Sequence, residues 1–278
     1  MRIARSALII YLVVILVFSA LQSWMIFPGA ATQGHPDAVV GRSDEYELVE
    51  LKSPAGQRIA AVFGKALGPG GTTHPDAAHQ PTIVWFYGNG MCMANCMDEF
   101  ERLRRLGCNV CIPEFLGYGM SEGKPSEAAV YQTAYAAWDY LMGREDVDKS
   151  KVIVAGWSLG SAAAIELASN KPVAGLMVFS AFTSMKDMAR RVLPWAPTGL
   201  MLQHHFKNEE KIKRIKAPIL IVHGSVDSVV PFDMSARRAK AAPHAMYVPI
   251  AAADHNDLFD VGGEEIYGRV AEFVAGIK

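Results

Sequence analysis

Short apolar runs alternate with helical segments along most of this chain. The runs are Thr82–Tyr87, Asn109–Pro113, Val152–Ala155, Ala174–Phe179, Ile219–His223 and Ala245–Ile250. The helical segments are Met91–Leu106, Glu127–Met142, Ser158–Ser169, Asp233–Ala241 and Glu264–Ile277. This alternation predicts an α/β fold with a mostly parallel, doubly wound sheet. Before it, Tyr46–Leu51 and Arg58–Phe63 flank a Pro/Gly turn and predict an antiparallel hairpin.

One pentapeptide in this pattern makes special demands on the backbone. Gly156-Trp157-Ser158-Leu159-Gly160 directly follows a β-branched apolar run and opens a helical stretch of small residues. A turn this tight strains the backbone of its central residue and leaves room only for small residues on either side. We therefore expect the Ser158 hydroxyl to stand at the carboxyl edge of the sheet, beside N–H groups of the helix N-terminus.

A serine hydroxyl becomes a strong nucleophile when an imidazole accepts its proton and an acid orients that imidazole. In a sheet of this kind the order along the chain is serine, acid, histidine. Asp227 lies in the turn after the run Ile219–His223, and His255 lies in the loop after Ala245–Ile250. We predict Ser158 as nucleophile, Asp227 as acid and His255 as base. The alternative for Asp227 is a turn residue that bonds its own backbone.

The other seven of the eight histidines fit the role of base less well. His204 and His205 precede Asp227 and break the expected order, and His223 ends a strand, where we expect a packed or capping residue. The rest lie in loops or at a strand start: His35, His74, His79 and His244.

Acyl transfer also needs two N–H donors for the oxyanion that develops on the substrate. Leu159 follows the nucleophile and supplies one candidate. The loop Tyr87-Gly88-Asn89-Gly90 follows another strand, and its Asn89 N–H is the second candidate. An ordinary glycine turn between strand and helix is the alternative for this loop.

The N-terminal segment Ala7–Phe27 is almost wholly apolar, and 21 helical residues span about 31 Å, the thickness of a hydrocarbon core. Arg2 and Arg5 precede it, so the positive-inside rule places the N-terminus in the cytoplasm and the rest on the outer side. A cleaved signal peptide is the alternative, but Phe18-Ser19-Ala20 does not make a good cleavage site.

We therefore divide the chain into a transmembrane signal-anchor helix (1–27), a tether (28–45) and one catalytic domain (46–278). We expect Trp24 and Phe27 at the membrane interface, and Pro28-Gly29 to end the helix. Residues 180–216 lack the strand–helix rhythm and contain Pro194 and Pro197, so they predict a short helical lid over the carboxyl edge of the sheet.

Charge and cysteines exclude several classes of function. A net charge of −1 argues against nucleic-acid binding, and the one basic cluster, Lys211–Lys216, fits a solvated helix end. The four cysteines suit neither disulfides nor a metal site by their spacing, and we expect them to be small buried hydrophobes. No cofactor motif is found, so we expect neither metal nor cofactor. Nothing in the sequence indicates an oligomeric state.

From about Tyr46 to its end the chain resembles the alpha/beta-hydrolase superfamily. It is most similar to a small, membrane-anchored branch that includes eukaryotic protein depalmitoylases and serine-aminopeptidase-like hydrolases. The resemblance rests on Tyr87–Gly90, Gly117–Gly123, Gly156–Gly160, Ala217–Asp227 with Val230-Pro231, and His255-Asn256-Asp257. The boundary segment Leu21–Pro28 also resembles that branch. The resemblance implies the same three site residues, Ser158, Asp227 and His255.

Three positions depart from that family's usual pattern. Tyr87 replaces a histidine before the oxyanion glycine, which places a phenol near the pocket. Glu114-Phe115-Leu116-Gly117 lacks the usual arginine, so we expect its supporting ion pair to be absent. Asp254 replaces a glycine before His255; it either raises the pKa of the base or, as we expect, points to solvent.

These features predict a membrane-tethered hydrolase that cleaves carboxylic esters or thioesters through an acyl-enzyme. The tether and the apolar lid favour acylated or lipid-like substrates over other small molecules. A peptidase on the same fold is an alternative, with Glu209 or Glu210 as candidates to hold a substrate amine. A non-catalytic binding protein is a third hypothesis. It is disfavoured because all three residues of a catalytic serine site are present.

Overall fold

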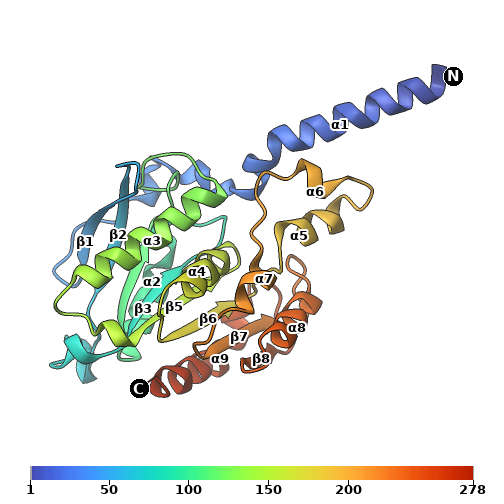
Figure 1. Ribbon diagram of the computed structural model, residues 1–278. Helices are drawn as coiled ribbons and strands as arrows, with labels where there is room; N and C mark the ends of the chain where they lie inside the picture. Colours follow the sequence, from blue (N-terminus) through green and yellow to red (C-terminus); the bar gives the residue numbers. More distant parts are fainter. Residues whose placement is uncertain (1, 278) are drawn as a thin grey trace.

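The computed structural model describes residues 2–277 and contains an eight-stranded sheet, ordered β1-β2-β4-β3-β5-β6-β7-β8 (Figure 1). Strands β3 to β8 are parallel, whereas β1 and β2 form an antiparallel hairpin, and β2 pairs antiparallel with β4. The strands are β1 (Glu47–Lys52), β2 (Arg58–Gly64), β3 (Thr82–Phe86), β4 (Asn109–Pro113), β5 (Val152–Trp157), β6 (Gly175–Phe179), β7 (Ile219–Gly224) and β8 (Met246–Ile250). The predicted doubly wound sheet and its N-terminal hairpin are confirmed.

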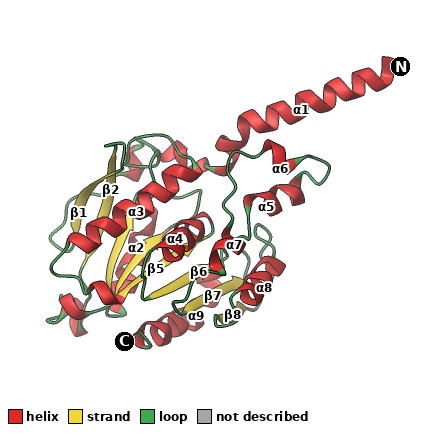
Figure 2. Cartoon of the chain, in the orientation of Figure 1, coloured by secondary structure: helices red, strands yellow, loops and turns green. Residues whose placement is uncertain are grey.

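Helices cover both faces of the sheet (Figure 2). Helices α3, α4 and α8 follow strands on one face, and α2 and α9 contact each other on the opposite face. The helices are α1 (Arg2–Ile26), α2 (Met97–Arg105), α3 (Glu127–Gly143), α4 (Leu159–Asn170), α5 (Met185–Val192), α6 (Thr198–Met201), α7 (Asn208–Ile212), α8 (Phe232–Ala241) and α9 (Leu258–Ala275). The three short helices α5, α6 and α7 make up the predicted lid segment.

Two helices differ from their predicted bounds. The α2 helix starts only at Met97, because a 3-10 turn stabilised by the Asn95 side chain, which accepts from the Cys92 N–H at 2.9 Å, precedes it. The α9 helix starts at Leu258, six residues before the predicted start, and includes a kink at Gly263. The loop that carries His255 is consequently shorter than the sequence pattern indicated.

The centre of the sheet is the core of the domain. Apart from Trp157 at the end of β5, the apolar residues of β3, β5 and β6 are fully or almost fully buried, as the β-branched runs predict for a parallel sheet covered on both faces. All four cysteines are buried and free, so the prediction that they serve as small hydrophobes is confirmed. The loops that follow β3, β5, β7 and β8 lie at the carboxyl edge of this sheet.

Helix α1 projects from this body, and its far end carries the N-terminus (Figure 1). Among residues 2–277 it is the one helix long and apolar enough to be a candidate membrane span, a property that signal sequences share. It ends at Ile26, and Pro28 begins a 3-10 turn, as predicted. The prediction that Phe27 lies at the membrane interface is wrong. Its side chain is 1% exposed and packs edge-on against His204 and Phe206 in the core, because the chain turns into the domain at this point.

The segment after α1 lies on the surface of the domain and is held there by hydrogen bonds. The Gly29 N–H donates to the Asn89 carbonyl at 2.8 Å, and the Gln33 side chain donates to the Ser121 carbonyl at 2.8 Å. Val40 is buried against the body. These contacts fix the point where α1 leaves the domain, close to the loop after β3.

Candidate active site

Ser158 occupies the tight turn between β5 and α4. Its backbone angles, φ 51° and ψ −116°, lie where residues with a side chain are rarely found. A β-carbon added at Gly156 would lie 2.2 Å from the Gly160 carbonyl oxygen, and one added at Gly160 would lie 2.0 Å from the Phe86 carbonyl oxygen. Both glycines of the pentapeptide are therefore required by the close approach of strand and helix, as predicted.

The structure brings the three predicted side chains into one hydrogen-bonded chain. His255 Nε2 lies 3.0 Å from the Ser158 hydroxyl oxygen, and His255 Nδ1 lies 2.9 and 3.1 Å from the two carboxylate oxygens of Asp227. All three residues are less than 10% exposed. In this arrangement the hydroxyl can pass its proton to Nε2, while the carboxylate fixes the tautomer with hydrogen on Nδ1.

Asp227 is held by several donors at once. The N–H groups of Val229 and Val230 donate to its Oδ1 at 3.0 and 2.7 Å, and His223 Nε2 lies 3.3 Å from its Oδ2. Burial alone would raise the pKa of this carboxyl, but the hydrogen bonds from His223, His255 and Val230 hold the pKa well below its usual range. The carboxylate therefore stays charged and available to the imidazole.

His223 is a second histidine at this carboxylate that sequence reasoning did not assign to the site. It is fully buried at the end of β7, and its Nε2 lies 2.8 Å from the Val230 carbonyl as well as near Asp227. The prediction of a packed residue holds, but the ring also braces the turn that carries Asp227. The spacing of four residues between the two was the signal that could have indicated the contact.

Two neighbours fix the histidine loop. The indole of Trp157 stacks on His255 with ring centroids 5.7 Å apart and an interplanar angle of 29°. Asp254 accepts from the Ser228 N–H at 2.6 Å and from the Ser228 hydroxyl at 3.0 Å. Asp254 lies at the protein surface, as expected, but its carboxylate also ties the His255 loop to the Asp227 turn through Ser228. Hydrogen bonds from Ser228 and from the His255 N–H lower the pKa of Asp254.

The two candidate oxyanion donors lie beside the serine. Leu159 is the first residue of α4, where main-chain N–H groups have no acceptor within the helix. The Asn89 backbone is held in place through its carbonyl, which accepts from the Gly29 N–H and from the Tyr118 hydroxyl at 3.1 Å. Asn89, Ser158 and Leu159 line the same cavity.

Two of the departures from the family pattern meet in one buried contact. The Tyr87 hydroxyl donates to Glu114, and the Glu114 carboxylate also accepts from the Met93 N–H at 3.0 Å and the Met120 N–H at 3.3 Å. Burial raises the pKa of both the Glu114 carboxyl and the Tyr87 phenol. In place of an ion pair with arginine, a phenol and two amides satisfy this carboxyl.

A cavity of about 250 Å³ opens at Ser158. Its lining is predominantly apolar and comes from the C-terminal turns of α1, the lid and the Val229-Val230 turn. Among the described residues that line it, none is acidic. Glu209 contacts Arg237, and Glu210 lies near Lys207 on the surface, so neither candidate for an amine-binding acid faces the cavity.

Comparisons with known proteins agree with this fold. A family model described as alpha/beta hydrolase fold matches residues 81–209. The alpha/beta hydrolase domain-containing protein WAV2 of Arabidopsis thaliana is 33% identical over 249 residues, covering 82% of this chain and 78% of WAV2. The Pyrococcus furiosus esterase Pf2001 shares the fold, with a TM-score of 0.68 and 19% identity over 85% of this chain and 96% of the esterase. A Mycobacterium tuberculosis puromycin-hydrolyzing peptidase gives a TM-score of 0.65 and 16% identity over 84% of this chain and 39% of the peptidase.

Proposed function

Because the chain belongs to the alpha/beta-hydrolase superfamily, we propose that it is a membrane-anchored serine hydrolase that cleaves carboxylic esters or thioesters. The observation that carries the proposal is the hydrogen-bonded chain from Ser158 through His255 to Asp227, beside an apolar cavity that Ser158 lines. A binding protein would have no use for a strained serine hydrogen-bonded to an oriented imidazole.

In the proposed reaction Ser158 Oγ attacks the carbonyl carbon of the substrate while His255 Nε2 takes the hydroxyl proton. The N–H groups of Asn89 and Leu159 stabilise the resulting oxyanion. The tetrahedral intermediate then expels the alcohol or thiol, which takes the proton from His255. Water attacks the acyl-enzyme by the same route, releases the carboxylic acid and returns the proton to Ser158. Asp227 stays ionised and stabilises the imidazolium in both halves.

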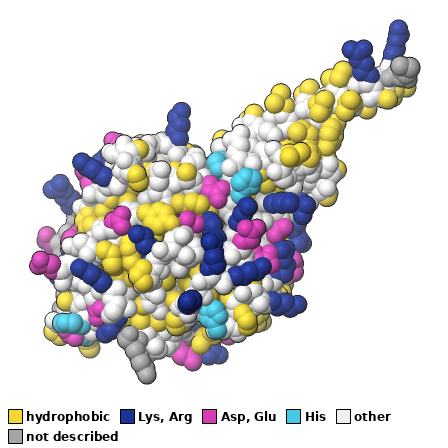
Figure 3. Space-filling model, in the orientation of Figure 1, with side chains coloured by type: hydrophobic (Ala, Val, Ile, Leu, Met, Phe, Trp, Pro, Cys, Tyr) yellow, Lys and Arg dark blue, Asp and Glu magenta, His cyan; other side chains and the backbone are white. Residues whose placement is uncertain are grey.

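We propose that α1 is retained as the anchor, as in the small membrane-anchored branch that the sequence resembles. Support comes from Phe27, which is part of the domain core, and from Gln22, which is buried against the lid. Arg2 and Arg5 at the far end of α1 (Figure 3) favour a cytoplasmic N-terminus and a catalytic domain on the outer side. A reporter enzyme active only outside the cytoplasm, fused after α9, tests this orientation; activity only of a cytoplasmic reporter would reverse it.

The proposal is tested with p-nitrophenyl esters of graded acyl length, with thioesters, and with aminoacyl anilides. We expect the native protein to hydrolyse esters or thioesters, and Ser158→Ala to abolish that activity. Ser169→Ala, at the far end of α4, is the matched control and keeps it. Cleavage of anilides in preference to esters would favour the peptidase, and turnover by a folded Ser158→Ala protein would overturn the assignment of the nucleophile.

A further inference from the structure

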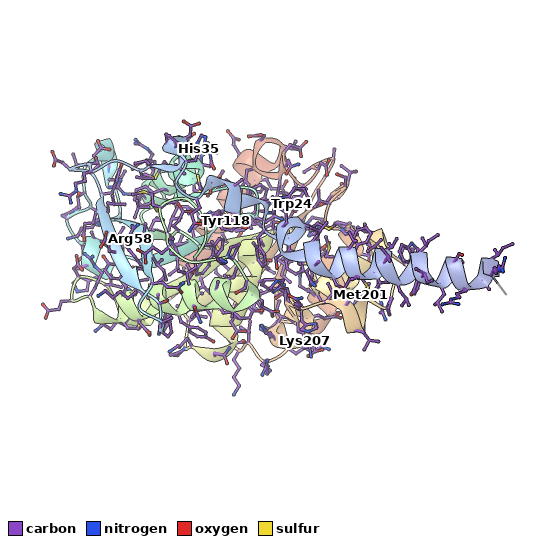
Figure 4. All side chains as sticks on the ribbon, turned by 90° about the horizontal axis from the view of Figure 1, so that it is seen from above. Trp24, His35, Arg58, Tyr118, Met201 and Lys207 are labelled. Atoms are coloured by element: carbon purple, nitrogen blue, oxygen red, sulfur yellow. The ribbon has the colours of Figure 1, made fainter. Side chains whose placement is uncertain are left out.

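One face of the anchor helix α1 is partly shielded from solvent by its own protein, and Gln22 on that face is buried. The residues of its C-terminal half that are partly shielded from solvent recur at helical spacing, as expected for a helix that packs along one stripe. They are Val14, Ile15, Phe18, Ser19, Gln22, Ser23 and Ile26. Figure 4 shows Met201 of the lid beside α1. A helix that served only as a tether would need no such contact with the domain it carries.

The polar residues in this stripe bind the lid. The Gln22 amide donates to the Met201 carbonyl at 3.1 Å and accepts from the Gln203 N–H at 2.7 Å. The Ser23 hydroxyl lies 3.0 Å from His204 Nε2. Gln22 is 6% exposed. A polar side chain in a membrane-spanning helix is costly unless it is hydrogen-bonded, and here the lid backbone supplies the partners.

The same face of α1 forms a wall of the cavity at Ser158. Phe18, Ser19 and Met25 line the cavity from α1, and Met185 and Met188 of α5 line it from the other side. Engineered apolar cavities of about 150 Å³ hold benzene, so by that measure the 250 Å³ here accommodates about ten carbon atoms. No charged side chain of residues 2–277 lines it, which suits a hydrocarbon chain and no polar head group.

The lid follows α1 well into the region that a bilayer would occupy. The rings of Tyr11 and Trp195 lie 5.9 Å apart, and Tyr11 is 15 residues, or about 22 Å, before the end of α1 at Ile26. Val192, Trp195 and Leu200 on the lid are 69%, 51% and 91% exposed. Large apolar side chains exposed along this part of the lid are suited to lipid rather than water.

We propose that α1 and the lid together form an acyl-chain chamber, which receives the chain of a membrane-resident ester or thioester directly from the bilayer. The carbonyl reaches Ser158 at the inner end, about ten carbons of the chain lie between α1 and α5, and the rest of a longer chain stays in the bilayer. The anchor helix is thus part of the substrate site and helps to set the acyl length that is accepted. This inference rests on the proposed hydrolase function and adds the substrate class and its route of entry.

The test uses the full-length protein in phosphatidylcholine vesicles with two substrates: a water-soluble acetate ester, and a palmitoyl ester that partitions into the vesicle. Ser19→Trp fills the chamber from the α1 side. We expect it to lower kcat/KM for the palmitoyl ester at least tenfold more than for the acetate ester. Ala20→Trp, on the exposed side of the same turn, is the matched control and leaves the ratio of the two rates unchanged.

Met188→Trp repeats the test from the lid wall, so that a folding defect in one variant does not decide the outcome. Equal effects of both variants on the two esters, or an equal shift with Ala20→Trp, would overturn the chamber. If the native protein hydrolyses neither ester, the hydrolase proposal itself fails. If it hydrolyses the acetate ester but not the palmitoyl ester, only the chamber is refuted.

Discussion

The carboxyl edge of the sheet and the interface between α1 and the lid both border Ser158, but they are built differently. At the sheet edge Asp227 accepts from two N–H groups and lies within reach of two histidines. At the α1–lid interface Gln22 and Ser23 supply the side-chain hydrogen bonds from α1, and apolar side chains surround them. We therefore expect the sheet edge to determine the reaction, and the looser α1–lid interface to determine which substrates enter the cavity.

The largest effect is expected at the sheet edge. His255→Ala removes the group that accepts the serine proton, and we expect kcat for the acetate ester to fall on the order of 10⁴-fold or more. His244→Ala, two residues before β8 and outside the site, is the control. Steady-state kinetics measure both. A fall of less than tenfold for His255→Ala would mean that another group serves as base.

Asp227→Asn keeps the shape of the turn but removes the charge that orients His255. We expect kcat to fall about 10³- to 10⁴-fold. The native carboxyl has a lowered pKa when folded, so its contribution to stability is complete above about pH 4 and is lost as pH falls toward the folded pKa. Urea unfolding of both proteins between pH 3 and 7 should therefore show a smaller loss at low pH for the variant. An equal loss of unfolding free energy at low pH in the native protein and in Asp227→Asn would contradict this expectation.

Gln22→Leu tests the looser region without adding charge. It removes two hydrogen bonds between α1 and the lid backbone, each worth about 0.5–1.5 kcal/mol. We expect amide hydrogen exchange of the segment around Gln203 to accelerate about 5- to 100-fold, while exchange in β5 stays unchanged. Equal protection of the lid in both proteins would show that apolar packing alone holds it.

The smallest effect is expected beneath the site, where Tyr87 and Glu114 meet. Tyr87→Phe leaves the buried Glu114 with one donor fewer, and we expect about 1–3 kcal/mol loss in the free energy of unfolding. Denaturation by urea measures it. The double variant Tyr87→Phe with Glu114→Gln should lose less than the sum of the two single variants, since each single change removes the same contact. Additive losses would mean that the two side chains are not coupled.

The sheet and the three site residues could be predicted from the sequence because each depends on patterns among neighbouring residues. The turn around Ser158 demands small residues within five positions, and Asp227 and His255 follow strands that are visible as apolar runs. The contacts that it missed join distant segments. Phe27 reaches Phe206, and Gln22 reaches Met201, across about 180 residues of chain, so no local pattern indicates them. The polar residues in α1 could be seen in the sequence, but the residues that they bind could not.

Asp254 illustrates the same limit over a shorter distance. Its carboxylate binds Ser228, on the turn of Asp227, and this pairing depends on how two loops from neighbouring strands are placed. Tyr87 and the missing arginine at Leu116 both depart from the family pattern, and only the structure shows that the Tyr87 hydroxyl donates to Glu114, the carboxyl left without that arginine. Residues that depart from a family pattern are therefore best examined in pairs.

The identity of the nucleophile is the central claim, and covalent labelling tests it most directly. The folded full-length protein is treated with a fluorophosphonate, digested, and analysed by mass spectrometry. A single adduct on Ser158 is the predicted result, formed on the native protein and lost in His255→Ala, where no base activates the hydroxyl. A folded protein that remains unlabelled at Ser158, or that is labelled at another serine, would contradict the account.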